Sequence, residues 1–236
     1  MASIIPSLDL FIVTSALNPN MGIINRQDRL QQTIDGLKSL RERCPNAVIL
    51  LAEGSPEKIE QEKIMQLQGL VDFVADFSAD PDISQFAANG RKSEAENVLM
   101  LKIMFLLKQE PGLMQLMQSV RRIYKLSART IITENFDLEE HDHFGKYVFK
   151  KRMPTWLSDS RKEFAPDLLI TRMFSFCPSL IDDYIRICKM NINLVMQTGI
   201  DTEHAHFVNM NKDHLLELDT IHCQGIMAGT GPTEIY

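Results

Sequence analysis

The sequence lacks the features that mark several large classes of protein. Its four cysteines are scattered and form no Cys-x-x-Cys pair, which argues against a disulfide framework and a cysteine-rich zinc site. No stretch approaches the roughly 18 uncharged apolar residues that a membrane-spanning helix requires. Pro6 and Asp9 stand where a secretory signal would carry its apolar run. We therefore expect a soluble, cytoplasmic protein without a transmembrane segment.

The chain also lacks an excess of positive charge. Its 25 Lys and Arg residues are outnumbered by 31 Asp and Glu residues, so the net charge is −6. Broad electrostatic binding to nucleic acid is not expected, although a local basic patch could hold a small phosphate-bearing molecule. With 236 residues, of which 44% are hydrophobic, the chain has the size of one large domain. A single domain over 1–236 is expected, and a homo-oligomer of it is compatible with the sequence.

Apolar runs alternate with helical periodicity along the first part of the chain. They predict strands at 9–15, 48–52, 71–77 and 123–133, helices at 30–43, 56–67, 94–108 and 113–120, and an irregular loop at 78–90. The later pattern is looser and predicts strands at 147–149 and 167–171 and helices at 178–189 and within 191–199. This alternation is typical of an α/β fold with a mainly parallel sheet flanked by helices.

Polar and charged residues gather where the predicted strands end and the next helices begin. In open α/β sheets, ligands bind outside the carboxyl ends of the strands. The candidates at these positions are Thr14, Arg26, Arg29, Glu53, Lys92, Lys125, Ser127 and Arg129.

The segment Lys125-Leu126-Ser127-Ala128-Arg129 carries a family resemblance. Over about residues 9–210 the ordered set of polar segments resembles GT-A-like glycosyltransferases of bacteria and viruses. In that family a helix that opens with lysine and glutamate precedes a Lys-hydrophobic-Ser-Gly-Arg-Tyr strand. This chain departs from the pattern at Ala128, where the family favours Gly, and at Thr130, where it favours Tyr.

The resemblance implies a GT-A-like (Rossmann-like), mixed and mainly parallel sheet. It implies a glycosyltransferase that takes a sugar from a nucleotide-diphosphate donor and transfers it to a glycan or other acceptor. The expected division is a nucleotide-binding half at 9–135, an acceptor half at 136–225 and an extended tail at 226–236. The eight residues at the strand ends are then the expected donor-binding set.

A diphosphate leaving group requires compensation of the negative charge that develops on it. Many GT-A enzymes use a metal held by an Asp-x-Asp motif, which is absent from the expected strand end here. Lys125 and Arg129 stand there instead, and cations can replace a metal as phosphate partners. No cofactor is therefore required, with a divalent ion such as Mn²⁺ as the alternative. The two cations could instead form structural ion pairs with Glu134 and Asp137.

An inverting transfer needs a base for the acceptor hydroxyl. By the resemblance, Glu203 is the candidate base with His204 as its orienting partner, and Asp137 or Glu134 are alternatives. Glu203 could equally be an acid that stabilises a helix start. Trp156 could stack on an acceptor sugar or anchor the core, and Arg172 is a further candidate acceptor contact.

Four of the six histidines form two His-x-His pairs, His141/His143 and His204/His206. On strands, residues two apart face the same side, so the pairs could clasp a metal ion in a hydrolase. A third hypothesis is a catalytically silent GT-A-like binding or assembly protein, which the absent Asp-x-Asp and the departures at Ala128 and Thr130 would explain.

Overall fold

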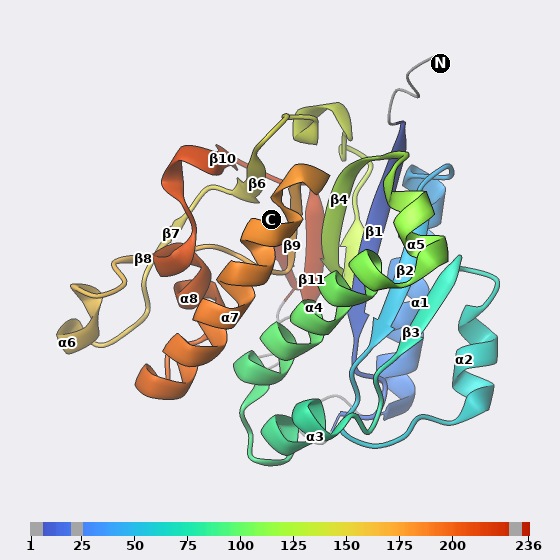
Figure 1. Ribbon diagram of the computed structural model, residues 1–236, viewed down its shortest axis with the longest axis horizontal. Helices are drawn as coiled ribbons and strands as arrows, with labels where there is room; N and C mark the ends of the chain where they lie inside the picture. The colour runs from blue at the N-terminus through green and yellow to red at the C-terminus, as the bar shows by residue number, and fades with distance from the viewer. Residues whose placement is uncertain (1–6, 20–25, 227–232) are drawn as a thin grey trace.

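The computed structural model describes residues 7–19, 26–226 and 233–236, which form an α/β fold around a seven-stranded sheet (Figure 1). The strand order is β10-β6-β9-β4-β1-β2-β3. The strands are β1 (Leu8–Ser15), β2 (Val48–Glu53), β3 (Phe73–Asp76), β4 (Val120–Ser127), β6 (Tyr147–Lys150), β9 (Met173–Phe176) and β10 (Leu215–Leu218). Strand β1 pairs in parallel with β2 and β4, β2 with β3, and β6 with β10, whereas β9 is antiparallel to β4 and β6. The predicted mixed, mainly parallel sheet is confirmed.

Helices cover both faces of this sheet. In Figure 1, α4 (Lys92–Gln109) and α7 (Ile181–Thr198) cross in front of the strands, and α1 (Arg26–Arg43) lies behind them. The alternation of side chains along β1 explains the two layers: Leu10 and Ile12 belong to the core under α4 and α7, and Phe11 and Val13 to the core under α1.

Shorter elements complete the chain. The remaining helices are α2 (Gln61–Leu67), α3 (Pro81–Ala88), α5 (Pro111–Met117), α6 (Asp159–Lys162) and α8 (Thr202–Asn209), with 3₁₀ turns η1 (Glu139–His141), η2 (Pro178–Leu180) and η3 (Lys212–His214). Strands β7 (Met153–Pro154) and β8 (Asp167–Leu168) pair in an antiparallel ribbon. Within the described ranges, no helix is both long enough and apolar enough to cross a bilayer.

A second sheet joins the strand that follows β4 to the last two strands of the described chain. It contains β5 (Thr130–Ile132), β11 (Cys223–Ile226) and β12 (Thr233–Ile235), all antiparallel. Part of the predicted extended tail is therefore a paired strand, and the terminal Tyr236 is buried. Residues 227–232 of the tail lie outside the described residues.

Several predicted boundaries were wrong. The expected loop at 78–90 contains α3, whose start is capped by Asp80: its carboxylate accepts from the backbone N–H groups of Asp82 and Ile83, and Pro81 occupies the first turn. The helix expected from residue 56 begins only at Gln61, and the two helices expected at 178–189 and 191–199 are the single helix α7. The strand expected at 123–133 is two strands in different sheets, because the chain turns at Ala128 and Arg129.

The turn between β4 and β5 packs closely on α1. A Cβ atom added to Gly36 would lie 2.4 Å from the carbonyl oxygen of Ala128 and 2.9 Å from that of Thr130. Only a residue without a side chain allows this approach. The contact fixes α1, which carries Arg29, against the turn that carries Arg129.

Candidate active site

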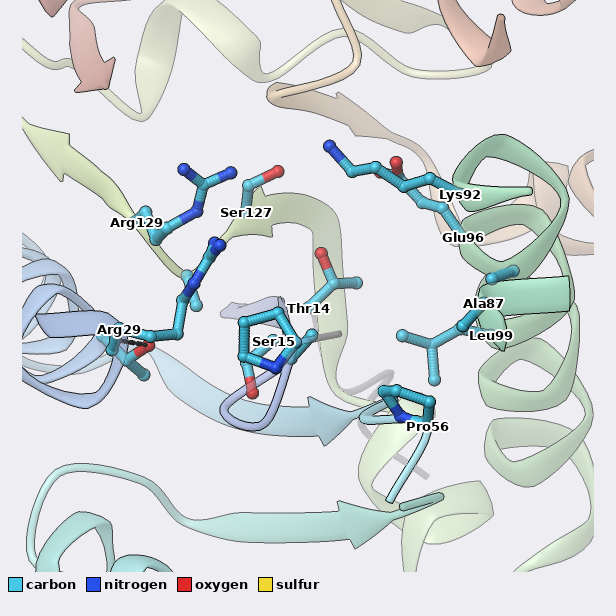
Figure 2. A pocket seen from close by; sticks show the side chains of 16 residues that line it. Thr14, Ser15, Arg29, Pro56, Ala87, Lys92, Glu96, Leu99, Ser127 and Arg129 are labelled. Carbon is cyan, nitrogen blue, oxygen red and sulfur yellow. Dashed lines mark hydrogen bonds between the residues drawn. The ribbon is translucent and has the colours of Figure 1, made fainter. Parts of the chain in front are cut away.

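A cavity of about 380 Å³ opens at the carboxyl ends of β1, β2 and β4 (Figure 2). Its floor includes Thr14 and Ser15 from the end of β1 and Ser127 from the end of β4. The first turns of α1 and α4 contribute the facing walls. This is the edge of the sheet at which the sequence predicts a ligand, and five of the eight predicted donor-binding residues line the cavity: Thr14, Arg29, Lys92, Ser127 and Arg129.

One wall of the cavity is cationic. Figure 2 shows the guanidinium groups of Arg29 and Arg129 on the same side, both directed toward the open space. Arg29 is 8% exposed, and its Nε has no hydrogen-bond partner among the described residues. Burial, followed by the neighbouring charges of Arg29 and Arg172, lowers the pKa of Arg129 to about 10. Placing two positive charges together away from water costs free energy, and a bound anion would lower that cost. This wall is therefore suited to bind an anion.

Lys125 lies behind the cavity wall. It is 1% exposed, and its ammonium donates to Glu96 Oε1 at 2.7 Å, to the carbonyl of Thr171 at 2.7 Å and to Ser127 Oγ at 3.1 Å. These bonds use all three ammonium hydrogens. Lys125 thus pairs with Glu96 and does not line the cavity, and among the described residues it forms no ion pair with Glu134 or Asp137.

Two other predicted donor contacts also lie outside the cavity lining. Glu53 is fully buried beneath Ser15, and its carboxylate accepts from the hydroxyls of Ser15 and Ser55 and from the backbone N–H of Leu17. Burial raises the pKa of Glu53, and these hydrogen bonds oppose the rise. Arg26 is exposed and forms an ion pair with Glu57 at 2.5 Å. Glu53 therefore ties together the loops after β1 and β2, and Arg26 belongs to the outer surface.

The wall opposite the arginines comes from α4. Lys92 and Glu96 stand one helical turn apart and both line the cavity. Burial raises the pKa of Glu96, but the charges of Lys125 and Lys92 and the hydrogen bond from Lys125 together leave the pKa below its ordinary value. The cavity therefore has two arginines on one side, and a lysine and a carboxylate on the other.

Glu203 lies on the first turn of α8, outside the cavity lining and within electrostatic reach of Glu96. Its Oε1 accepts from the Thr171 hydroxyl at 3.0 Å. Burial, followed by the charges of Glu96 and Asp201, raises the pKa of Glu203 to about 7. A carboxyl with this pKa can exchange protons near neutral pH.

His204 is not oriented toward Glu203. Its Nδ1 contacts Asp201 Oδ1 at 2.6 Å and its Nε2 contacts the Thr155 hydroxyl at 2.7 Å. The prediction of a Glu203–His204 pair is corrected by this arrangement, because neighbouring side chains on a helix diverge by about 100°. Asp137 is exposed after β5, caps the backbone N–H of Glu139 at 2.9 Å and does not line the cavity.

The two predicted acceptor contacts lie near this region. Trp156 is 61% exposed, and its Nε1 donates to Asp201 Oδ2 at 3.1 Å while its ring meets His204 edge-on. Trp156 is therefore a surface aromatic whose indole N–H is held by Asp201, and it is not a core anchor. Arg172 stacks over the ring of Tyr236, 5.0 Å from its centroid. Its backbone carbonyl accepts from Ser127 N–H at 2.8 Å.

The histidine pairs do not form a metal site in the described part of the chain. His206 lies in α8 with His204, so the two side chains point to different sides of a helix and not to one face of a strand. His206 contacts Asn191 at 3.1 Å, and His141 contacts Ser175 at 2.9 Å. No group of three or more His, Cys, Asp or Glu side chains in the described ranges is placed to hold a metal ion.

Sequence reasoning missed three residues of this region: Glu96, Thr171 and Asp201. The four-residue spacing of Lys92 and Glu96 in a helix could have placed Glu96 on the same wall. Asp201 directly precedes a helix, which is a signal for an N-cap, and it caps α8 by accepting from His204 N–H. No local signal identifies Thr171.

Glu203→Gln is expected to stabilise the protein at alkaline pH. The raised pKa means that the folded state holds the Glu203 proton more tightly than the unfolded chain, so the stabilisation is present below about pH 4.5 and is lost as pH rises to about 7. At pH 8 the glutamine variant should exceed the wild type by on the order of 2 kcal/mol in free energy of unfolding, and near pH 4 the two should be equal. Urea unfolding across this pH range measures the difference. The exposed Glu42→Gln should show no such trend, and a pH-independent effect of Glu203→Gln would contradict the assignment.

Several solved structures share this fold although their sequences differ from that of this chain. No protein-family model and no curated protein sequence matches the chain. Solved structures do match. An active-site mutant of LgtC is 9% identical, covers 89% of this chain and 72% of its own, and has a TM-score of 0.53. Mouse xyloside xylosyltransferase 1 in its apo form is 15% identical, with coverages of 90% and 85% and a TM-score of 0.51.

Core-mannan synthase A from Aspergillus fumigatus, in an Mn/GDP form, is also similar. It is 8% identical, with coverages of 94% and 79% and a TM-score of 0.50. At such low identities the likeness concerns the fold alone. The chain has the fold of the GT-A glycosyltransferases.

Proposed function

We propose that this protein is a glycosyltransferase that binds a nucleotide-diphosphate sugar in the cavity between α1 and α4. The observation that carries the proposal is the convergence of Arg29 and Arg129 on a cavity at the carboxyl ends of β1 and β4 in a GT-A fold. Sheets of this kind bind ligands at that edge.

The arginine wall suits the diphosphate. Guanidinium groups bind phosphate oxygens through charge-assisted and often bidentate hydrogen bonds. When the bond from the sugar to the β-phosphate breaks, the electron pair stays on the diphosphate, and Arg29 and Arg129 stabilise the charge that develops. Thr14, Ser127 and Lys92 complete the donor-binding set. Lys125 acts indirectly, because it holds Glu96 and Ser127 in place.

The side chains around the cavity fit a metal-independent site better than a manganese site. Divalent cations of this kind prefer several oxygen ligands, commonly carboxylates. Of the residues that the structure describes around the cavity, Glu96 alone has a carboxylate, and that carboxylate already pairs with Lys125.

Glu203 is the proposed base. With a pKa of about 7, a fraction of Glu203 is ionised at neutral pH and can take the proton of an acceptor hydroxyl as that oxygen attacks the sugar. Trp156 offers an exposed ring to an acceptor glycan near the start of α8, and its indole is linked to the α8 N-cap through Asp201. Arg172 is the second proposed acceptor contact. These positions favour Glu203 over Asp137 as the base.

Thermal shift measurements with UDP, GDP, UDP-glucose and GDP-mannose test the proposal, each with chelator and with Mn²⁺. We expect stabilisation by at least one nucleoside diphosphate, unchanged by chelator. No stabilisation by any nucleotide would contradict the function, and stabilisation only with Mn²⁺ would contradict metal independence. Release of nucleoside diphosphate from the bound donor in the presence of glycan acceptors then separates an enzyme from a silent GT-A-like binding protein.

A further inference from the structure

Glu96 is placed to contact a part of the ligand that the arginines do not reach. It lines the cavity from α4, and Figure 2 shows it on the side facing Arg29 and Arg129. Its side chain is 25% exposed, although its partner Lys125 is only 1% exposed. A buried ammonium thus supports a carboxylate that faces the cavity.

Within the described residues, only one carboxylate oxygen of Glu96 accepts a hydrogen bond. Oε1 accepts from Lys125 at 2.7 Å, and Oε2 makes no hydrogen bond within the described residues. An ionised carboxylate oxygen accepts hydrogen bonds and donates none. Its partners in a ligand must therefore be donors such as hydroxyl groups, and phosphate oxygens are excluded by repulsion.

The opposed walls determine how a donor can lie in the cavity. The diphosphate is attracted to Arg29 and Arg129. On the α4 wall, Lys92 stands one turn from Glu96, and Oε2 of Glu96 accepts hydrogen bonds from sugar hydroxyls but not from phosphate oxygens, so the sugar is directed toward Glu96. We propose that Glu96, held in place by Lys125, accepts hydrogen bonds from the hydroxyl groups of the donor sugar and selects an uncharged polyhydroxylated ring over a sugar acid. This inference rests on the proposed function and specifies its donor class.

The test compares Glu96→Gln with the wild type by titration calorimetry, using UDP, UDP-glucose and UDP-glucuronate, and GDP and GDP-mannose. The wild type should bind the uncharged sugar nucleotide about tenfold more tightly than the parent diphosphate, and UDP-glucuronate more weakly than UDP-glucose. In the variant the advantage of the uncharged sugar should disappear, while affinity for the parent diphosphate stays the same or rises, because a repelling charge has been removed.

Two further variants make the result interpretable. Glu94→Gln removes the same charge from the same helix at a residue that pairs with Arg91 and does not line the cavity, so it should bind all probes as the wild type does. The single variant Glu96→Gln leaves the buried Lys125 ammonium without its charged partner, which destabilises the fold. The double variant Lys125→Met, Glu96→Gln removes both charges and should show the same loss of sugar discrimination.

The outcomes separate the two proposals. If no nucleotide binds the wild type, the proposed function fails. If nucleoside diphosphates bind but Glu96→Gln weakens the parent diphosphate and the sugar nucleotide equally, or changes neither, the role of Glu96 is overturned while the function stands. Tighter binding of UDP-glucuronate than of UDP-glucose to the wild type would also overturn it, and would point to Lys92 as the residue that contacts the sugar.

Discussion

Arg129→Ala is expected to weaken the binding of a nucleoside diphosphate about 100-fold, since a bidentate charge-assisted contact is lost from a buried site. The same change should alter the free energy of unfolding of the ligand-free protein by less than about 1 kcal/mol. Burial and the nearby charges of Arg29 and Arg172 already disfavour the Arg129 cation, as its lowered pKa of about 10 indicates. Loss of binding without loss of stability is the signature of a residue held in place for its ligand.

Calorimetry and urea unfolding measure the two effects. Arg43→Ala is the matched control, because Arg43 is an exposed arginine at the far end of α1 from Arg29. It should leave both binding and stability unchanged. Undiminished diphosphate binding by Arg129→Ala would show that the cationic wall is not the phosphate site.

Gly36→Ala is expected to destabilise the protein by about 2–3 kcal/mol, although alanine normally favours a helix over glycine. The added Cβ would lie 2.4 Å from the carbonyl oxygen of Ala128, and a backbone group cannot turn aside as a side chain can. Helix α1 must therefore move away from the turn after β4. That movement separates Arg29 from Arg129, so diphosphate affinity should fall together with stability.

Gly69→Ala provides the control for this prediction. A Cβ at Gly69 would meet no atom within 4 Å, so the variant should unfold like the wild type and bind nucleotide normally. Chemical denaturation measures the difference between the two alanine variants. Equal stability of Gly36→Ala and Gly69→Ala would mean that α1 does not pack on the turn as described.

The first strands and helices of the fold could be predicted because their signals are local. Strands β1 and β2 are short apolar runs that the sheet buries on both faces, and α4 shows an extended apolar surface. The ends of the predicted strands and the starts of the helices that follow them then indicated where Thr14, Arg29 and Arg129 would meet. Helix α3 was missed because its apolar surface is small, with Ile83 as its buried residue, although Asp80 and Pro81 mark its start.

The roles within the site depend on contacts between distant segments. Lys125 and Arg129 look alike in the sequence, but Lys125 points to Glu96 and Thr171 behind the wall, whereas Arg129 points into the cavity. The partners of Lys125 lie 29 and 46 residues away in the chain. The same limit applies to His204, which contacts Asp201 and not Glu203. It also applies to the His-x-His pairs, whose geometry depends on whether they lie in a strand or a helix.

The most direct test of the account is a crystal structure of the protein with a nucleoside diphosphate, grown in the presence of chelator. The account predicts the diphosphate in the cavity, with its oxygens within about 3 Å of the guanidinium nitrogens of both Arg29 and Arg129. A diphosphate bound elsewhere, or held in this cavity only through a metal ion, would contradict it.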